Sequence, residues 1–141
     1  MSAPFTTRGA RPFVLHRGGC HCGAVAYEVM APAIIEALEC NCSICRMSGF
    51  LHLIVPRSRF RLLRGETALA EYRFNTGVAR HLFCRNCGVK SFYAPRSHPD
   101  GWSVNVRCLA PETVAGVEIE LFDDNDRDAA QARFAGLAAP D

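Results

Sequence analysis

The 141-residue sequence contains no hydrophobic run long enough to cross a membrane. A transmembrane helix needs about 20 mostly apolar residues, and no segment approaches even ~18. The first twelve residues also lack the apolar core that a signal peptide needs. We therefore expect a cytoplasmic protein without membrane contact, whose residues 1–12 form a flexible N-terminus.

Runs of like charge are absent too, although the formal net charge is +2 and the pI is about 8.2. Nucleic-acid binders gather lysine and arginine in one segment or on one face. The arginines here are spread singly along the chain. We therefore expect no nucleic-acid partner.

The sequence has no internal repeat and no low-complexity segment. Its hydrophobic content of 49% is enough to bury the core of one domain without disulfide bonds. We expect a single metal-binding domain over 13–122, followed by a C-terminal tail over 123–141.

Short segments with alternating apolar residues dominate the pattern. Val25, Tyr27 and Val29 alternate with Ala26 and Glu28, which is the period of a half-buried strand. The pattern predicts a mostly β, antiparallel fold with little helix. The predicted strands cover 13–16, 24–29, 34–39, 51–55, 60–63, 69–74, 81–84, 90–93, 102–106 and 117–122. Helix is predicted only for a turn or two after Cys42 and, from its alanine content, for 126–137.

Seven of the eight cysteines fall into three clusters. The clusters are Cys20 with Cys22, Cys40 with Cys42 and Cys45, and Cys84 with Cys87. In a reducing compartment, closely spaced cysteines indicate metal ligands or catalytic groups rather than disulfides. Structural zinc sites use four protein ligands, whereas catalytic sites use three and leave one position open. Two pairs make a closed site, and the group of three remains.

The two pairs have the form of zinc knuckles, because Gly23 follows Cys22 and Gly88 follows Cys87. A glycine at this position permits the positive φ that turns backbone N–H groups toward the metal. Such a site would connect the first hairpin to the second half of the chain and would be essential for folding. The alternative is that Cys20 and Cys22 are simply buried, small hydrophobic residues.

Cys40, Cys42 and Cys45 predict an open metal site, in which an exogenous thiol takes the fourth position and loses its proton. Two alternatives remain. Cys108 could supply a fourth ligand and close the site, or Cys42 and Cys45 or Cys108 could form a reversible disulfide in a thiol redox enzyme. The adjacent Arg46 either offsets the negative charge and holds a substrate carboxylate or is an ordinary solvated arginine.

The chain resembles the glutathione-dependent formaldehyde-activating enzyme family, also called the centromere protein V/formaldehyde-activating domain. The resemblance covers about 14–109 and rests on Gly18-Gly19-Cys20-His21-Cys22-Gly23, Cys40-Asn41-Cys42-Ser43-Ile44-Cys45-Arg46 and Phe83-Cys84-Arg85-Asn86-Cys87-Gly88, with Asn105 to Leu109 after them. It implies an Mss4-like fold and two Zn²⁺ per chain. The structural zinc would be bound by Cys20, Cys22, Cys84 and Cys87, and the catalytic zinc by Cys40, Cys42 and Cys45.

The resemblance also implies an enzyme of the carbon–sulfur lyase class that joins formaldehyde to the co-substrate glutathione as S-hydroxymethylglutathione. A role in aldehyde detoxification follows from that activity. The alternative is a non-catalytic zinc module that binds a protein partner or carries glutathione adducts. His52, His81 and Tyr93 are candidates for proton transfer or for polarising the carbonyl, with an ordinary structural role as the alternative for each. Phe50 and Trp102 either line the substrate cleft or pack in the core.

Overall fold

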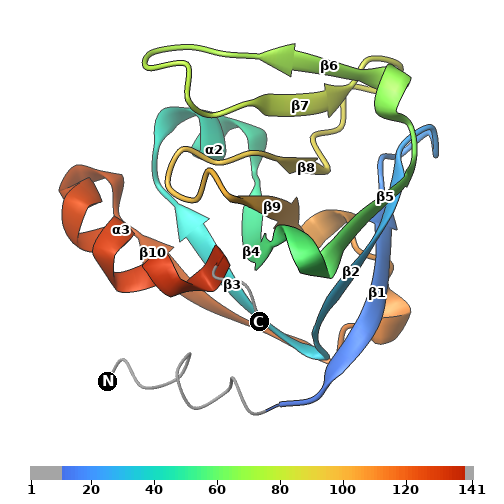
Figure 1. Ribbon diagram of the computed structural model, residues 1–141, viewed down its shortest axis with the longest axis horizontal. Coiled ribbons are helices and arrows are strands. Elements are labelled where there is room, and N and C mark those ends of the chain that lie inside the picture. Colours follow the sequence, from blue (N-terminus) through green and yellow to red (C-terminus); the bar gives the residue numbers. More distant parts are fainter. Residues whose placement is uncertain (1–10, 139–141) are drawn as a thin grey trace.

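Three sheets form the framework of the computed structural model, which describes residues 11–138 (Figure 1). The flexible terminus predicted for 1–12 therefore lies almost wholly outside the described residues. The first sheet has the order β1 (Phe13–Gly19), β2 (Ala26–Pro32) and β5 (Phe60–Arg64). Strands β1 and β2 form an antiparallel hairpin in which Gly19 is opposite Ala26. The tip of this hairpin carries Cys20 and Cys22.

The second sheet has five strands in the order β10, β3, β4, β9 and β8. Their bounds are Gly116–Phe122, Ile34–Cys40, Leu51–Pro56, Gly101–Asn105 and Phe92–Tyr93. Strand β10 runs parallel to β3, whereas the other pairs are antiparallel. The third sheet is the antiparallel pair β6 (Leu69–Tyr72) and β7 (His81–Cys84). Strand β7 packs against β8, as Figure 1 shows.

Within residues 11–138, the helical part consists of two short α-helices and several 3₁₀ turns. Helix α2 spans Ser43–Ser48 and ends at Gly49, whose φ of 68° lies in the left-handed region that ends many helices. Helix α3 spans Arg127–Phe134. The 3₁₀ turns cover Arg57–Arg59, Glu66–Ala68, Val106–Cys108, Pro111–Thr113, Asp124–Asp126 and Ala135–Ala138.

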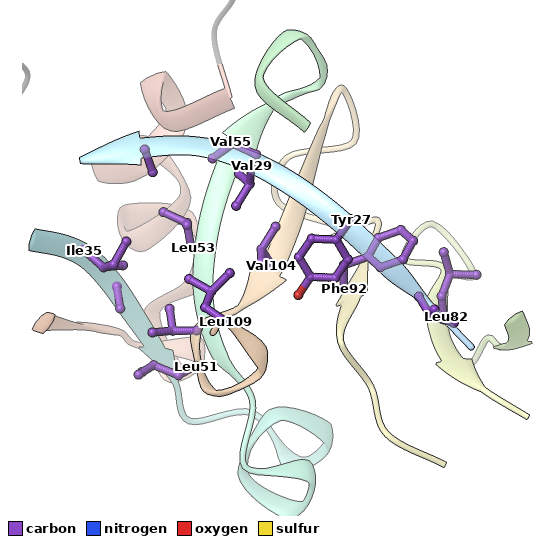
Figure 2. Packing of buried hydrophobic residues seen from close by; sticks show 14 of the residues in the cluster. Tyr27, Val29, Ile35, Leu51, Leu53, Val55, Leu82, Phe92, Val104 and Leu109 are labelled. Carbon is purple, nitrogen blue, oxygen red and sulfur yellow. The ribbon is translucent and has the colours of Figure 1, made fainter. Parts of the chain in front are cut away.

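The main core lies between the first two sheets and extends to β7 (Figure 2). The alternation read from the sequence places Val25, Tyr27 and Val29 on the buried face of the first hairpin. Strand β4 is buried along its whole length, as expected for the centre of a sheet. A second cluster joins α3 to this sheet, with Phe134 and Ala130 packed against Leu38 and Ile54.

The mostly β, antiparallel fold predicted from the sequence is confirmed, with the parallel β3–β10 pair as a local departure. Residues 123–138 of the predicted tail include α3 and contribute to the second cluster. Within residues 11–138, no helix is both long and apolar enough to span a membrane.

Candidate functional site

Four cysteines from two distant turns converge at one end of the molecule. Cys20 and Cys22 lie at the tip of the β1–β2 hairpin, and Cys84 and Cys87 lie where β7 ends. The Cys22 Sγ atom is 3.6 Å from that of Cys20 and 3.7 Å from that of Cys84. Four sulfurs at ~2.3 Å from a tetrahedral zinc ion would be about 3.8 Å apart, so the spacing fits such an ion.

The local backbone has the knuckle geometry expected from the glycines. Gly23 and Gly88 have φ values of 84° and 78°. The N–H of Val25 donates to Cys20 Sγ at 3.2 Å, and the N–H of Gly88 donates to the carbonyl of Cys84 at 2.7 Å. These four cysteines can hold one metal ion.

The second cysteine group forms where β3 meets α2. Cys40 ends β3, Cys42 occupies the N-cap of α2 and the buried Cys45 lies on the helix. The N–H of Arg46 donates to the carbonyl of Cys42 at 2.9 Å, which closes the turn that brings Cys45 back. The three sulfurs lie within 4.8 Å of one another. This all-thiolate donor set suits a soft divalent ion such as zinc.

No fourth histidine, cysteine, aspartate or glutamate among residues 11–138 joins this group. Cys108 lies elsewhere, on the turn after β9, where its thiol is 4.0 Å from the carbonyl oxygen of Lys90. Burial raises the pKa of Cys108 to about 11. The arrangement therefore differs from the alternative in which Cys108 closes the second site.

The three cysteines line a cavity of about 180 Å³ that opens to solvent. Its far wall comes from β4, β7, β8 and the segment that follows β6. His52, His81 and Tyr93 line it, together with Phe74 and Arg96. The structure thus brings all three predicted proton-transfer candidates to the cavity.

Both ring nitrogens of His52 contact polar atoms of other residues. Its Nε2 lies 3.2 Å from Cys45 Sγ, and its Nδ1 lies 2.8 Å from the hydroxyl of Ser103 and 3.4 Å from that of Tyr93. Ser103 faces it diagonally across the β4–β9 ladder. Burial, and then the nearby Lys90 ammonium, lower the pKa of His52 to about 3. In the tautomer with the proton on Nε2, the neutral ring would donate to the Cys45 sulfur and accept from the Ser103 hydroxyl.

The thiols of the second group share their protons unequally. Hydrogen bonds from Cys40 and Cys45 lower the pKa of Cys42 to about 2, which favours the thiolate form of this sulfur. The same contacts raise the pKa of Cys45, and the contact with Cys42 raises that of Cys40. Burial raises the pKa of Tyr93 far above its ordinary value. The negative charge favoured at Cys42 suits the binding of a cation by this group.

His81 has a different environment from His52. The Lys90 ammonium donates to His81 Nδ1 at 2.7 Å and lies 4.0 Å from the centre of the Tyr93 ring. The rings of Tyr93 and Phe74 stack on His81 at 4.9 and 5.3 Å. Burial, and then Lys90, lower the pKa of His81 to about 4.

Lys90 was not among the residues predicted from the sequence, although one feature of the sequence sets it apart. It is the only lysine in a chain with fifteen arginines. Burial lowers its pKa to about 8, while the negative charge of the cysteine group acts in the opposite direction. The rarity of lysine in this sequence could have marked Lys90 as a candidate for the site.

The remaining predicted residues lie outside the cavity. Arg46 is exposed and borders a neighbouring hollow with Gly49 and Arg107. Phe50 is buried and packs against His52 and Tyr93, with ring centres 4.6 and 5.1 Å away. Trp102 packs on Phe60 and Phe92 in the main core. Both aromatic side chains thus support the protein framework.

Comparison with known proteins agrees with this geometry. The family model described as "Glutathione-dependent formaldehyde-activating enzyme" matches residues 15–125. A crystal structure of a protein from Rhodobacter sphaeroides is 37% identical, with a TM-score of 0.63, and the match covers 74% of this chain and 99% of that one. The matched segment contains all three cysteine clusters and the cavity histidines. The chain belongs to the glutathione-dependent formaldehyde-activating enzyme family.

Proposed function

We propose that this chain catalyses the addition of the glutathione thiol to formaldehyde, giving S-hydroxymethylglutathione, and the reverse carbon–sulfur cleavage. The observation that carries the proposal is the group of Cys40, Cys42 and Cys45, which lines an open cavity without a fourth protein ligand among residues 11–138. Three ligands and one open position characterise catalytic rather than structural zinc sites.

We assign a structural zinc to Cys20, Cys22, Cys84 and Cys87 and a catalytic zinc to the group of three. When bound there, zinc supplies a position for an exogenous thiol and lowers its pKa, so that the thiol reacts as a thiolate at neutral pH. The chain's own residues would hold the ion and shape the cavity. With Cys45 as a thiolate ligand, His52 would carry its proton on Nε2 and donate it to Cys45 Sγ, which lies 3.2 Å away, and so would fix the direction of that ligand.

The size of the cavity supports a small aldehyde. About 180 Å³ is less than the roughly 300–1,000 Å³ of sites that enclose a drug-sized ligand. The cavity therefore encloses the reacting thiol and formaldehyde, while the rest of the tripeptide lies at the opening. Arg96 lines the cavity and is exposed, which places a cation where a substrate carboxylate would lie.

Exchange NMR tests the proposal directly. Magnetisation transfer between free glutathione and its hydroxymethyl adduct should be faster with the zinc-loaded protein than without it. Cys42→Ser should abolish the acceleration, while the matched control Cys108→Ser should retain it. A wild-type protein with two zinc ions that accelerates no exchange over a panel of small aldehydes would contradict the proposal.

One observation favours the non-catalytic alternative as a second candidate. Strand β10 exposes Val117, Ile119 and Leu121 on one face, with 39%, 55% and 50% of their surfaces accessible. An exposed apolar stripe is typical of surfaces that bind another protein. Native mass spectrometry during a glutathione titration separates the two candidates. An unchanged zinc content without any glutathione adduct would favour the non-catalytic module over the enzyme.

A further inference from the structure

Two histidines line the cavity, and of these only His81 has a ring nitrogen, Nε2, that makes no hydrogen bond to another residue within 11–138. His52 uses Nε2 toward Cys45 and Nδ1 toward Ser103. His81 uses Nδ1 toward the Lys90 ammonium at 2.7 Å. His81 lines the cavity and Lys90 does not. Because Nδ1 faces Lys90, Nε2 is the ring nitrogen that is free to face the cavity.

The Lys90 contact determines where the proton of a neutral His81 lies. An ammonium has three donors and no acceptor, so the nitrogen that faces it must be the acceptor of the imidazole. Nδ1 is therefore unprotonated, and the proton is on Nε2. The stacked rings of Tyr93 and Phe74 hold the imidazole plane in place.

We propose that His81 donates a hydrogen bond from Nε2–H to the carbonyl oxygen of the aldehyde, and that Lys90 is the positioning residue that fixes this tautomer. The inference rests on the proposed function, since it assigns a role within that reaction. It distinguishes the two histidines of the cavity: His52 orients a sulfur ligand, and His81 binds the substrate oxygen.

The chemical step is addition to a carbonyl. The thiolate sulfur forms a bond to the formaldehyde carbon, the carbon–oxygen π bond breaks, and its electron pair moves to the oxygen. The Nε2–H group of His81 stabilises the negative charge that develops there. A neutral imidazole is too weak an acid to give up this proton, so the alkoxide takes its proton from water and His81 remains neutral.

The charged groups around His81 are consistent with a neutral ring. Lys90 faces Nδ1, the hydroxyl-bearing ring of Tyr93 lies on β8, and Tyr72 contacts the ring from β6. Cys42 provides a more distant negative charge that opposes the effect of Lys90. Burial and Lys90 together keep the pKa of His81 near 4, so the ring is neutral at physiological pH.

The tautomer can be measured without any activity assay. Long-range ¹H–¹⁵N spectra of the histidine-labelled, zinc-loaded protein distinguish Nε2–H from Nδ1–H, and His81→Gln identifies the His81 signals by their loss. We expect the Nε2–H form in the wild type. Lys90→Met should produce a mixture of tautomers, whereas Lys90→Arg, which keeps a cationic donor, should restore the Nε2–H form. A wild-type Nδ1–H signal would overturn the inference even if no variant folds.

Exchange rates provide the second readout. His81→Phe should slow glutathione–formaldehyde exchange by about 100- to 1,000-fold, the order expected for losing one hydrogen-bond donor to the oxyanion in the transition state. His81→Gln retains a donor near the Nε2 position, so its exchange rate should fall less than that of His81→Phe. The exchange rate of Lys90→Met should fall in proportion to its fraction of the Nε2–H tautomer. The exposed Arg61→Gln serves as a control at the wild-type rate.

The outcomes separate the two proposals. A wild-type protein that accelerates exchange, together with His81→Phe at an unchanged rate and unchanged zinc content, overturns the role of His81. A pure Nε2–H tautomer in Lys90→Met overturns the positioning role of Lys90. A wild-type protein that accelerates no exchange overturns the proposed function itself, and the role of His81 with it.

Discussion

The Nε2 atom of His52 lies 3.2 Å from the Sγ atom of Cys45, in a fully buried contact between β4 and α2. Ser103 on β9 fixes the other ring nitrogen at 2.8 Å. Outer contacts of this kind set the direction and the basicity of a metal ligand. The relation makes His52 part of the candidate metal site, a role that differs from the proton transfer or carbonyl polarisation for which the sequence made it a candidate.

Removing the His52 contact should weaken metal binding at the group of three cysteines. We expect His52→Phe to lower zinc affinity there by about 10- to 100-fold, because Cys45 loses its donor. His52→Gln, which offers an amide near the Nε2 position, should lose less. Competition with a chelator, followed by native mass spectrometry, measures the change; equal affinities in all three proteins would contradict the role of His52.

The four-cysteine site should determine whether the protein folds. Structural zinc contributes apparent binding free energies of roughly 10–16 kcal/mol, comparable with the stability of a whole domain. We expect Cys87→Ser to be unfolded or insoluble. Cys108→Ser, which removes a thiol outside both groups, should keep the fold and two metal ions per chain. Circular dichroism and metal analysis make the comparison, and wild-type melting of Cys87→Ser would remove the structural assignment.

The C-terminal helix should contribute measurable stability. Phe134 is 4% exposed and packs with Leu38, Ile54 and Phe122. Phe134→Ala should lower the free energy of unfolding by about 3–5 kcal/mol, because it removes a buried ring and leaves a cavity. The exposed Asp128→Ala on the same helix should change it by less than about 1 kcal/mol. Urea titration tests both, and equal midpoints would show that α3 packs weakly.

Lys90 should make stability depend on pH. Its pKa is about 8 in the folded protein, below the ordinary lysine value of 10.5. Between these values the unfolded chain holds the proton more tightly, so stability should rise with pH over this window as the folded state escapes the cost of a buried charge. Lys90→Met should lack this rise. Comparing the two proteins cancels the titration of the cysteines, and parallel stability curves from pH 8 to 10 would contradict the shift.

The titration itself can be followed at one signal. Because Lys90 is the only lysine in the sequence, reductive methylation with ¹³C-formaldehyde labels one side chain besides the N-terminal amine. The labelled amine should titrate below the ordinary lysine range, with Lys90→Arg as the control for assignment. An ordinary pKa would place the ammonium in water rather than against Tyr93.

Much of the fold could be read from alternation and turn residues. The strand predicted over 81–84 has the bounds of β7, and the remaining predicted strands overlap β1 to β6 and β8 to β10. These elements depend on the period of buried side chains and on local turn chemistry, which neighbours in the sequence provide. The parallel pairing of β10 with β3 could not be read this way, because the partner of a strand depends on contacts between distant segments.

The candidate site also has a part that local sequence predicted and a part that depends on contacts between distant segments. The spacing of Cys20 with Cys22 and of Cys84 with Cys87, each followed by glycine, predicted a shared site that the structure assembles across 62 residues. Arg46 and Trp102, also candidates from their sequence neighbourhood, lie outside the cavity. Proximity along the chain does not determine on which side of a helix or strand a residue meets its neighbours.

The sequence by itself determined the cysteine groups, the mostly β class and the family, because knuckle turns and strand periodicity depend on residues only a few positions apart. The tertiary structure decided which residues the cavity histidines contact and which cysteines come together. It directed His52 to a sulfur and His81 to Lys90, and it placed Cys108 away from the group of three. Those contacts depend on the register of β4, β7 and β9, which only the packed sheets establish.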